Sequence, residues 1–168
     1  IAKSKIPTIA LAHGFCIGGA TSLVSACDIR LATKDAKFSI GETKLGLVAD
    51  VGVIQRMPKI VSSGDMNELA LTGRIFDGEH AERIRFVSKA YENSDELFEA
   101  GEKLANEISS NSKRIVQATK QALEKSANLT VDQGLEYAKL WSTSFLVSED
   151  LREGVMAFLE KRDPKFNE

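Results

Sequence analysis

Residues 6–20 read IPTIALAHGFCIGGA and join an apolar run to two glycine turns and a helix start. The short, continuous apolar run at 6–12 is typical of a buried strand, and His13-Gly14 and Gly18-Gly19 interrupt the chain after it. A helical pattern over 20–26 follows at once. A strand that leads through a glycine turn into a helix N-terminus leaves backbone N–H groups free at one place. This stretch therefore predicts a site for an anion or a developing oxyanion.

Two carboxylates follow in a stretch that is otherwise rich in small and apolar residues. Glu42 and Asp50 lie within the irregular, glycine-containing residues 41–52, a pattern typical of a functional loop. Apolar surroundings raise the pKa of a carboxyl group and suit it to general acid–base work. We expect such surroundings for Glu42 from its neighbours Ile40, Leu45, Leu47 and Val48. The alternatives are a surface glutamate at position 42 and an N-cap of the next helix at position 50.

Composition limits the classes of protein that remain. A chain of 168 residues, 43% of them hydrophobic, suffices for one well-buried domain or at most two. Its net charge of −2, with both signs interspersed, predicts no nucleic-acid footprint, and no apolar run approaches the roughly 20 residues of a membrane span. Cys16 and Cys27 stand in apolar runs. We expect reduced core thiols rather than a buried disulfide, which fits a reducing compartment.

The pattern along the chain changes about halfway. Up to residue 93 it predicts strand–helix units, with strands at 6–12, 28–32, 36–40 and 86–91 and helices at 20–27, 52–61, 65–72 and 77–84. Beyond residue 93 it predicts four helices that begin at Ser94, Ser112, Thr130 and Ser148. We therefore expect a core with the active-site residues at 1–93 and a helical region at 94–168. Trp141 and Phe145 on the third of these helices are core residues or part of a subunit interface.

Several motifs occur in the order in which the crotonase superfamily, the enoyl-CoA hydratases and isomerases, carries them. The chain resembles that family at PTIALAHGFCIGGA (7–20), ACDIR (26–30), AKF (36–38), GL (46–47), QRMP (55–58), ALTGR (70–74), REG (152–154) and AFLEKR (157–162). The resemblance implies an α/β fold, the C-terminal part of a ββα superhelix, followed by a helical region that builds a homotrimer or a dimer of trimers. It also implies acyl-CoA thioester substrates and no metal or redox cofactor.

The resemblance further implies that an N-terminal part of the family fold is absent from this chain. That part supplies a second oxyanion-hole N–H and much of the site for the CoA adenine. A cut chain, a separate chain and a shortened relative all remain possible. The mitochondrial matrix, the peroxisome and the cytoplasm also remain open. The last residues, 165–168, do not match a peroxisomal Ser-Lys-Leu signal.

The family pattern implies roles for individual residues. Gly19 matches the donor of one oxyanion-hole N–H, Gly18 the neighbouring substrate-binding glycine, and Glu42 the general acid–base glutamate. Phe158 and Lys161 resemble residues that contact the CoA adenine and phosphate. An amphipathic helix with an exposed lysine is the alternative explanation for these last two.

The second carboxylate points to a subfamily. GLVADVG at 46–52 is similar to the Δ3,5-Δ2,4-dienoyl-CoA isomerases. In those enzymes one carboxylate removes a proton from C2 and another delivers a proton to C6, and Glu42 and Asp50 match that pair. We therefore expect conversion of a 3,5-dienoyl-CoA to a 2,4-dienoyl-CoA.

Ser22 departs from the family pattern. Hydratases have their second glutamate at this position and dienoyl isomerases an aspartate. A serine hydroxyl does not exchange protons near neutral pH, so hydration by two glutamates is disfavoured. The other possible activities are those of a Δ3-Δ2-enoyl-CoA isomerase and of an enoyl-CoA hydratase-like enzyme. A non-catalytic crotonase-fold protein that binds an acyl-CoA, an RNA or a partner subunit is the alternative of another class.

Overall fold

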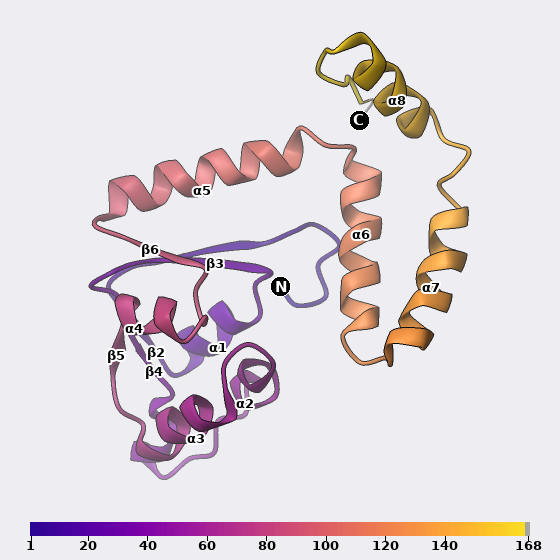
Figure 1. The fold of residues 1–168 in the computed structure, drawn as a ribbon. Helices are drawn as coiled ribbons and strands as arrows, with labels where there is room; N and C mark the ends of the chain where they lie inside the picture. The colour runs from indigo at the N-terminus through magenta and orange to yellow at the C-terminus, as the bar shows by residue number, and fades with distance from the viewer. Residues whose placement is uncertain (167–168) are drawn as a thin grey trace. The chain divides into compact units, whose positions relative to one another are not determined.

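The computed structural model describes residues 1–166 and divides into two compact units (Figure 1). The first unit contains Ile1–Ser4 and Thr8–Lys103, and the second contains Lys5–Pro7 and Leu104–Glu168. The elements of the first unit are β1 (Ile9–Ala12), β2 (Phe15–Ile17), α1 (Gly19–Ser25), β3 (Ile29–Thr33), β4 (Lys37–Ser39), η1 (Gly41–Leu45), α2 (Val53–Arg56), η2 (Met57–Lys59), α3 (Ser63–Thr72), β5 (Phe76–Asp77), α4 (Gly78–Arg83) and β6 (Lys89–Tyr91). Helix α5 (Ser94–Ser109) runs from the first unit into the second, which also holds α6 (Lys113–Ser126), α7 (Val131–Thr143) and α8 (Glu149–Glu160). The boundary expected between residues 93 and 94 stays a prediction.

Two small sheets form the first unit. One has the order β1-β3-β6 and is parallel throughout, and the other has the order β2-β4-β5 with β5 antiparallel to β4. The chain enters the first sheet at β1, crosses to the second at β2, passes through α1 and then repeats this path with β3 and β4. This alternation is the ββα superhelical path expected for the first part of the chain.

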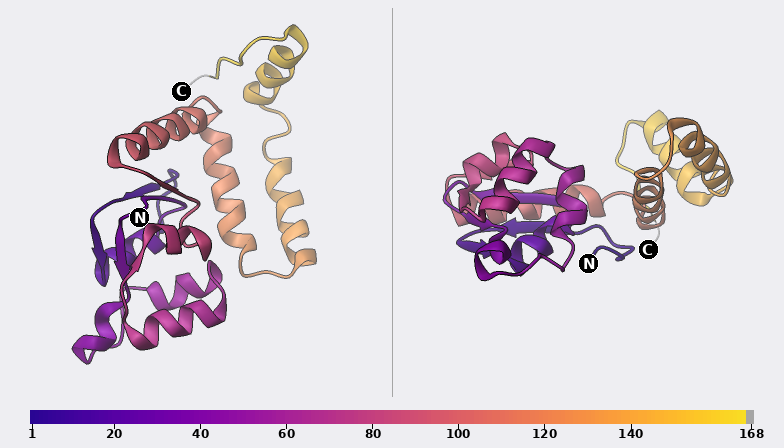
Figure 2. Two further views of the ribbon diagram at one scale, coloured as in Figure 1. Left: turned by 60° about the vertical axis from the view of Figure 1, so that its left-hand side comes forward. Right: turned by 90° about the horizontal axis from the view of Figure 1, so that it is seen from below.

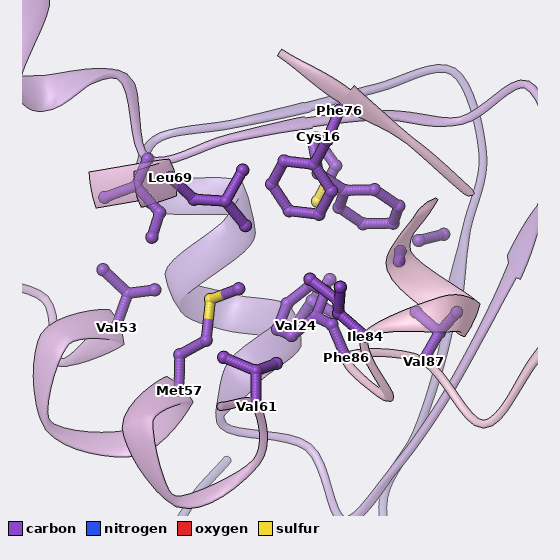
Figure 3. Packing of buried hydrophobic residues seen from close by; sticks show 14 of the residues in the cluster. Cys16, Val24, Val53, Met57, Val61, Leu69, Phe76, Ile84, Phe86 and Val87 are labelled. Carbon is purple, nitrogen blue, oxygen red and sulfur yellow. The ribbon is translucent and has the colours of Figure 1, made fainter. Parts of the chain in front are cut away.

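The core of the first unit lies where strands and helices bring apolar side chains together. Phe38 of β4 and Phe86 are both fully buried, and their rings meet edge to face with centroids 5.5 Å apart. Figure 3 shows Val24 of α1 and Met57 of η2 among the side chains that converge on the same region. Burying each such side chain contributes about 1.5–3 kcal/mol. This packing holds α1 against the strands and so positions the residues at its start.

Three of the four expected helix caps are present and one is wrong. In α5 the side chain of Asn93, not of Ser94, accepts the hydrogen bond of the Glu96 N–H, at 2.9 Å. Ser94 is already the first residue of the helix. Asparagine caps as well as serine does, so composition alone does not separate the two neighbours. The side chains that cap as expected are Ser112, Thr130 and Ser148.

The strand prediction missed β2 and β5 and made two strands too long. Strand β2 has three residues between Gly14 and Gly18, whose φ angles are 63° and 58°, and β5 has only two. Such short strands carry no periodic pattern. The strand expected from residue 6 begins at Ile9, and the carbonyl of Ile6 instead accepts a hydrogen bond from Lys120 Nζ within the second unit. The last strand is confined to β6.

In the second unit α6 and α7 run antiparallel, side by side (Figures 1 and 2). The Trp141 indole Nε1 donates to the Ala118 carbonyl at 3.0 Å. The Trp141 ring lies between the rings of Tyr137 and Phe145, with centroid distances of 6.0 and 5.7 Å. Trp141 and Phe145 are half-buried in this packing, so they contribute to the core of the unit without being closed off from solvent.

Candidate active site

The site is built around the turn between β2 and α1. Gly18 adopts φ 58° and ψ −117°, a conformation that side chains with a Cβ avoid, and its N–H donates to the Ser39 carbonyl at 2.8 Å. Gly19 is the first residue of α1, so its N–H has no carbonyl within the helix to bond. Gly19 is also exposed. The turn thus leaves the exposed Gly19 N–H without an intrahelical partner, and its use as an oxyanion donor stays a prediction.

Glu42 lies against this turn. It follows β4 in the 3₁₀-helix η1, and the pairing of Ile17 in β2 with Ser39 in β4 brings the two segments together. A Cβ atom at Gly18 would lie 3.3 Å from Oε1 of Glu42 and 3.6 Å from its Cδ. Oε2 of Glu42 is buried and has no hydrogen-bond partner among residues 1–166. Glu42 is therefore not an ordinary surface glutamate: its carboxylate packs against Gly18, and one of its oxygens is buried without a partner in the described residues.

Ser22 lies one turn into α1. It is only 1% exposed, and its N–H bonds to the Gly18 carbonyl at 3.0 Å. Its Oγ finds no partner within the described part of the chain. Position 22, where the family resemblance implied a carboxylate, is thus occupied by a buried, neutral hydroxyl.

Asp50 is exposed in the segment between η1 and α2. It does not cap α2, because the N-cap is Gly52 with φ 102° and no side-chain hydrogen bond. The capping alternative for Asp50 is therefore wrong. Among residues 1–166 no hydrogen bond or ion pair joins Asp50 to Gly18 or Glu42, so its pairing with Glu42 stays a prediction.

The apolar surroundings expected for Glu42 are only partly present. Ile40 is 1% exposed and belongs to the core. The other three neighbours are largely exposed in this chain: Leu45 at 76%, Leu47 at 60% and Val48 at 80%. The loop therefore offers an apolar surface beside the carboxylate rather than a closed pocket around it.

Phe158 and Lys161 belong to the second unit. Phe158 is 82% exposed and lines an open apolar groove of about 700 Å³ between α6, α7 and α8, together with Trp141. Lys161 ends α8 with a left-handed φ of 54°. Their role in binding CoA stays a prediction.

Cys16 and Cys27 do not pair with each other, as expected, but only Cys16 is buried in the core, and Cys27 is half-buried. Burial raises the pKa of the Cys16 thiol to about 11, so it remains protonated and unreactive at neutral pH. Within residues 1–166, no group of three or more His, Cys, Asp or Glu side chains is arranged to hold a metal ion. None of the described helices is long and apolar enough to cross a membrane.

Sequence reasoning assigned no role to Thr21 and Ser39, whose polar groups meet at the turn. The only available signal was a polar residue within the first turn of an otherwise apolar helix, and such residues are common at helix starts. Their contact depends on the pairing of β2 with β4, which no local pattern reveals.

Comparisons with known proteins agree on one family. The family model for enoyl-CoA hydratase/isomerase matches residues 1–168. A mitochondrial Δ3,5-Δ2,4-dienoyl-CoA isomerase of Dictyostelium discoideum is 50% identical over 166 residues, and a peroxisomal one of Arabidopsis thaliana is 43% identical. These matches cover 99% of this chain but only 57% and 60% of the two relatives, so the chain spans little more than half of their length.

The fold comparison gives the same result. An enoyl-CoA hydratase from Mycobacterium tuberculosis superposes with a TM-score of 0.92 at 32% identity, covering 97% of this chain and 64% of that one. One from Bacillus anthracis gives a TM-score of 0.92 at 29% identity, covering 99% and 64%. The expected α/β crotonase fold is confirmed, as part of the family core followed by helices. The chain belongs to the enoyl-CoA hydratase/isomerase family.

Proposed function

We propose that the full-length protein is an isomerase that converts a 3,5-dienoyl-CoA to a 2,4-dienoyl-CoA. The names of the Dictyostelium and Arabidopsis relatives support this activity, and so does the motif GLVADVG at 46–52. The observation that carries the proposal is the position of the Glu42 carboxylate against Gly18, next to the N–H of Gly19.

The first step removes a proton from C2 of the substrate. The thioester oxygen accepts a hydrogen bond from the Gly19 N–H, and negative charge develops on that oxygen as the C2–H bond breaks. One such donor lowers the barrier by about 2.7–4 kcal/mol. We assign removal of the C2 proton to Glu42, because its carboxylate packs against Gly18, the residue before the proposed N–H donor. Its Oε2, which has no hydrogen-bond partner among residues 1–166, takes the proton.

The second step adds a proton at C6. Loss of the C2 proton moves the electron pair of the C2–H bond into a C2–C3 double bond, the C3–C4 double bond shifts to C4–C5, and the electron pair of the C5–C6 double bond forms the new C–H bond at C6. We assign this proton to Asp50, at the far end of the conjugated system. The reaction is a 1,5 proton shift with no net oxidation and no added water, so it needs no metal or redox cofactor.

The burial of Ser22 and the exposure of Asp50 are also compatible with a second activity. The buried hydroxyl of Ser22 cannot act as the second acid–base group that hydration requires. Asp50 is exposed, whereas Glu42 packs against the turn, an arrangement that a Δ3-Δ2-enoyl-CoA isomerase with a single acid–base group would also have. Turnover of a 3-enoyl-CoA separates this activity from that of a dienoyl isomerase.

The remaining proposals concern the oligomeric state, the CoA contacts and the cellular location. The apolar groove between α6, α7 and α8 and the exposed Phe158 support association through the helical region, as a homotrimer or a dimer of trimers. Phe158 and Lys161 would then contact CoA. The relatives' names support a mitochondrial or a peroxisomal location.

The experiment is an assay of the full-length protein on 3,5-octadienoyl-CoA, a 3-enoyl-CoA and a 2-enoyl-CoA. Glu42→Gln and Asp50→Asn are assayed alongside, because each removes a titratable carboxyl group with little change of shape. We expect formation of the 2,4-dienoyl product and its loss in both variants. Unchanged turnover in Asp50→Asn would contradict the two-carboxylate mechanism, and no turnover of any substrate would favour a non-catalytic binding protein.

A further inference from the structure

Thr21 lies in the first turn of α1 and is fully buried. Most buried hydroxyl groups form a hydrogen bond. Its Oγ1 lies 2.5 Å from the carbonyl oxygen of Cys16 and 3.0 Å from that of Ser39. Cys16 is the middle residue of β2 and Ser39 ends β4, so the single proton of this hydroxyl is shared between carbonyls of two paired strands. The start of α1 is thereby fixed to both.

The Ser39 carbonyl also accepts the N–H of Gly18, at 2.8 Å. Hydrogen bonds from Gly18 and from Thr21 therefore hold the chain on both sides of the peptide that carries the Gly19 N–H. The same strand end is anchored a third time, because Ser39 Oγ donates to the Gly73 carbonyl at 2.9 Å. Helix η1, which carries Glu42, begins directly after it. The free N–H and the carboxylate thus share one anchor, the end of β4.

We infer that Thr21 is a positioning residue, whose hydroxyl fixes the direction of the Gly19 N–H relative to the Glu42 carboxylate. The inference rests on the proposed function, because it requires the Gly19 N–H to act as an oxyanion donor. Such a donor is effective only when it is held in place before charge develops. Thr21 itself touches no reacting atom and acts through Gly19.

Two variants isolate the hydroxyl. Thr21→Val replaces it by a methyl group at nearly constant volume, and Thr21→Ser keeps it. Thr33→Val is the matched control, because Thr33 is 2% exposed in the same unit and its Oγ1 has no partner among the described residues. If Thr21→Val does not fold, Thr21→Ser and Thr21→Ala, which differ only by the hydroxyl, make the same comparison.

The readouts are kcat, KM and the near-ultraviolet absorbance of bound acetoacetyl-CoA as a function of pH, all on the full-length protein. The absorbance reports the enolate of this β-ketothioester, and an oxyanion donor lowers the pH at which the enolate forms. A loss of structure alone does not change the pKa of a bound ligand in the fraction that stays folded.

In Thr21→Val we expect kcat to fall about tenfold to a hundredfold with a much smaller change in KM, because the donor acts mainly in the transition state. We also expect the pKa of the bound enolate to rise, while Thr21→Ser and Thr33→Val behave as the wild type. An unchanged enolate pKa and kcat in Thr21→Val, or an equal loss in Thr33→Val, would overturn the inference. A wild-type protein that does not lower the enolate pKa would contradict the proposed oxyanion site itself, and with it this role for Thr21.

Discussion

Replacing Gly18 by alanine places a methyl group between the β2–α1 turn and the Glu42 carboxylate. The backbone at Gly18 has φ 58° and ψ −117°, and a Cβ atom there would lie 3.3 Å from Oε1 of Glu42. Gly14 provides a matched control, because its φ is also positive, at 63°, but a Cβ atom would meet nothing within 4 Å. Both substitutions place a Cβ atom at a positive φ, and only Gly18→Ala brings it against the carboxylate.

The magnitudes follow from these two contributions. A residue held in a sparsely populated backbone region costs about 1–3 kcal/mol, so both variants should be less stable by this amount. For a chain of this size each kcal/mol lowers the Tm by about 2–4 °C. Gly18→Ala also displaces the carboxylate by a few tenths of an ångström or more. We therefore expect its kcat to fall about tenfold to a hundredfold, while Gly14→Ala keeps a kcat close to that of the wild type.

The assay combines thermal unfolding of each variant with dienoyl-CoA turnover, measured well below the lower of the two Tm values. Comparable losses of stability with a selective loss of kcat in Gly18→Ala would support the contact between turn and carboxylate. A Gly18→Ala variant as active as Gly14→Ala would refute it, because the methyl group cannot then be reaching Glu42.

Three further predictions concern stability and ionisation. Gly101→Ala should destabilise the protein by about 1–3 kcal/mol in urea unfolding, because the added Cβ would lie 2.6 Å from both Leu11 methyl groups; a neutral effect would show that Leu11 moves freely. Burial raises the pKa of Cys16 from 9.0 to about 11, so the unfolded thiol ionises first and stability should fall between pH 9 and 11; a Cys16→Ala variant with the same alkaline loss would contradict this. Hydrogen bonds from Arg162 hold the pKa of Glu153 at about 2 instead of 4.5, so the pair's stabilisation is complete above pH 4.5 and is lost as the pH falls towards 2. Arg162→Gln should raise the pKa of Glu153, measured by NMR titration, and an unchanged value would exclude the pairing in solution.

Local signals predicted much of this molecule. The glycine turn at Gly18-Gly19 was visible because glycine marks positive φ angles, and three helix caps were visible because Ser and Thr precede helical patterns. The position of Glu42 beside the turn depends instead on the pairing of β2 with β4. Strand β2 was not predicted, so only the family resemblance pointed to that proximity.

Other features were not predicted because the sequence does not show which residue takes a given structural role. Gly52 caps α2 because glycine tolerates a φ of 102°. No residue pattern in the sequence showed that Gly52, rather than Asp50, is the cap. The sequence does not reveal that Leu45 and Val48 are exposed. Hydrophobicity shows that burial of a side chain is favourable but not which residues would bury it. The role of Thr21 was not predicted, because its two carbonyl partners come from different strands.

The most direct measurement follows deuterium in a reaction run in D₂O. The full-length protein and its Glu42→Gln and Asp50→Asn variants are incubated with a 3,5-dienoyl-CoA, and product and recovered substrate are analysed by NMR. If Glu42 is the base at C2 and Asp50 the acid at C6, the wild type puts deuterium at C6 of the product. Asp50→Asn still exchanges the C2 protons of the substrate, and Glu42→Gln does neither. Exchange at C2 that persists in Glu42→Gln, or an unchanged label at C6 in Asp50→Asn, would contradict the assigned roles.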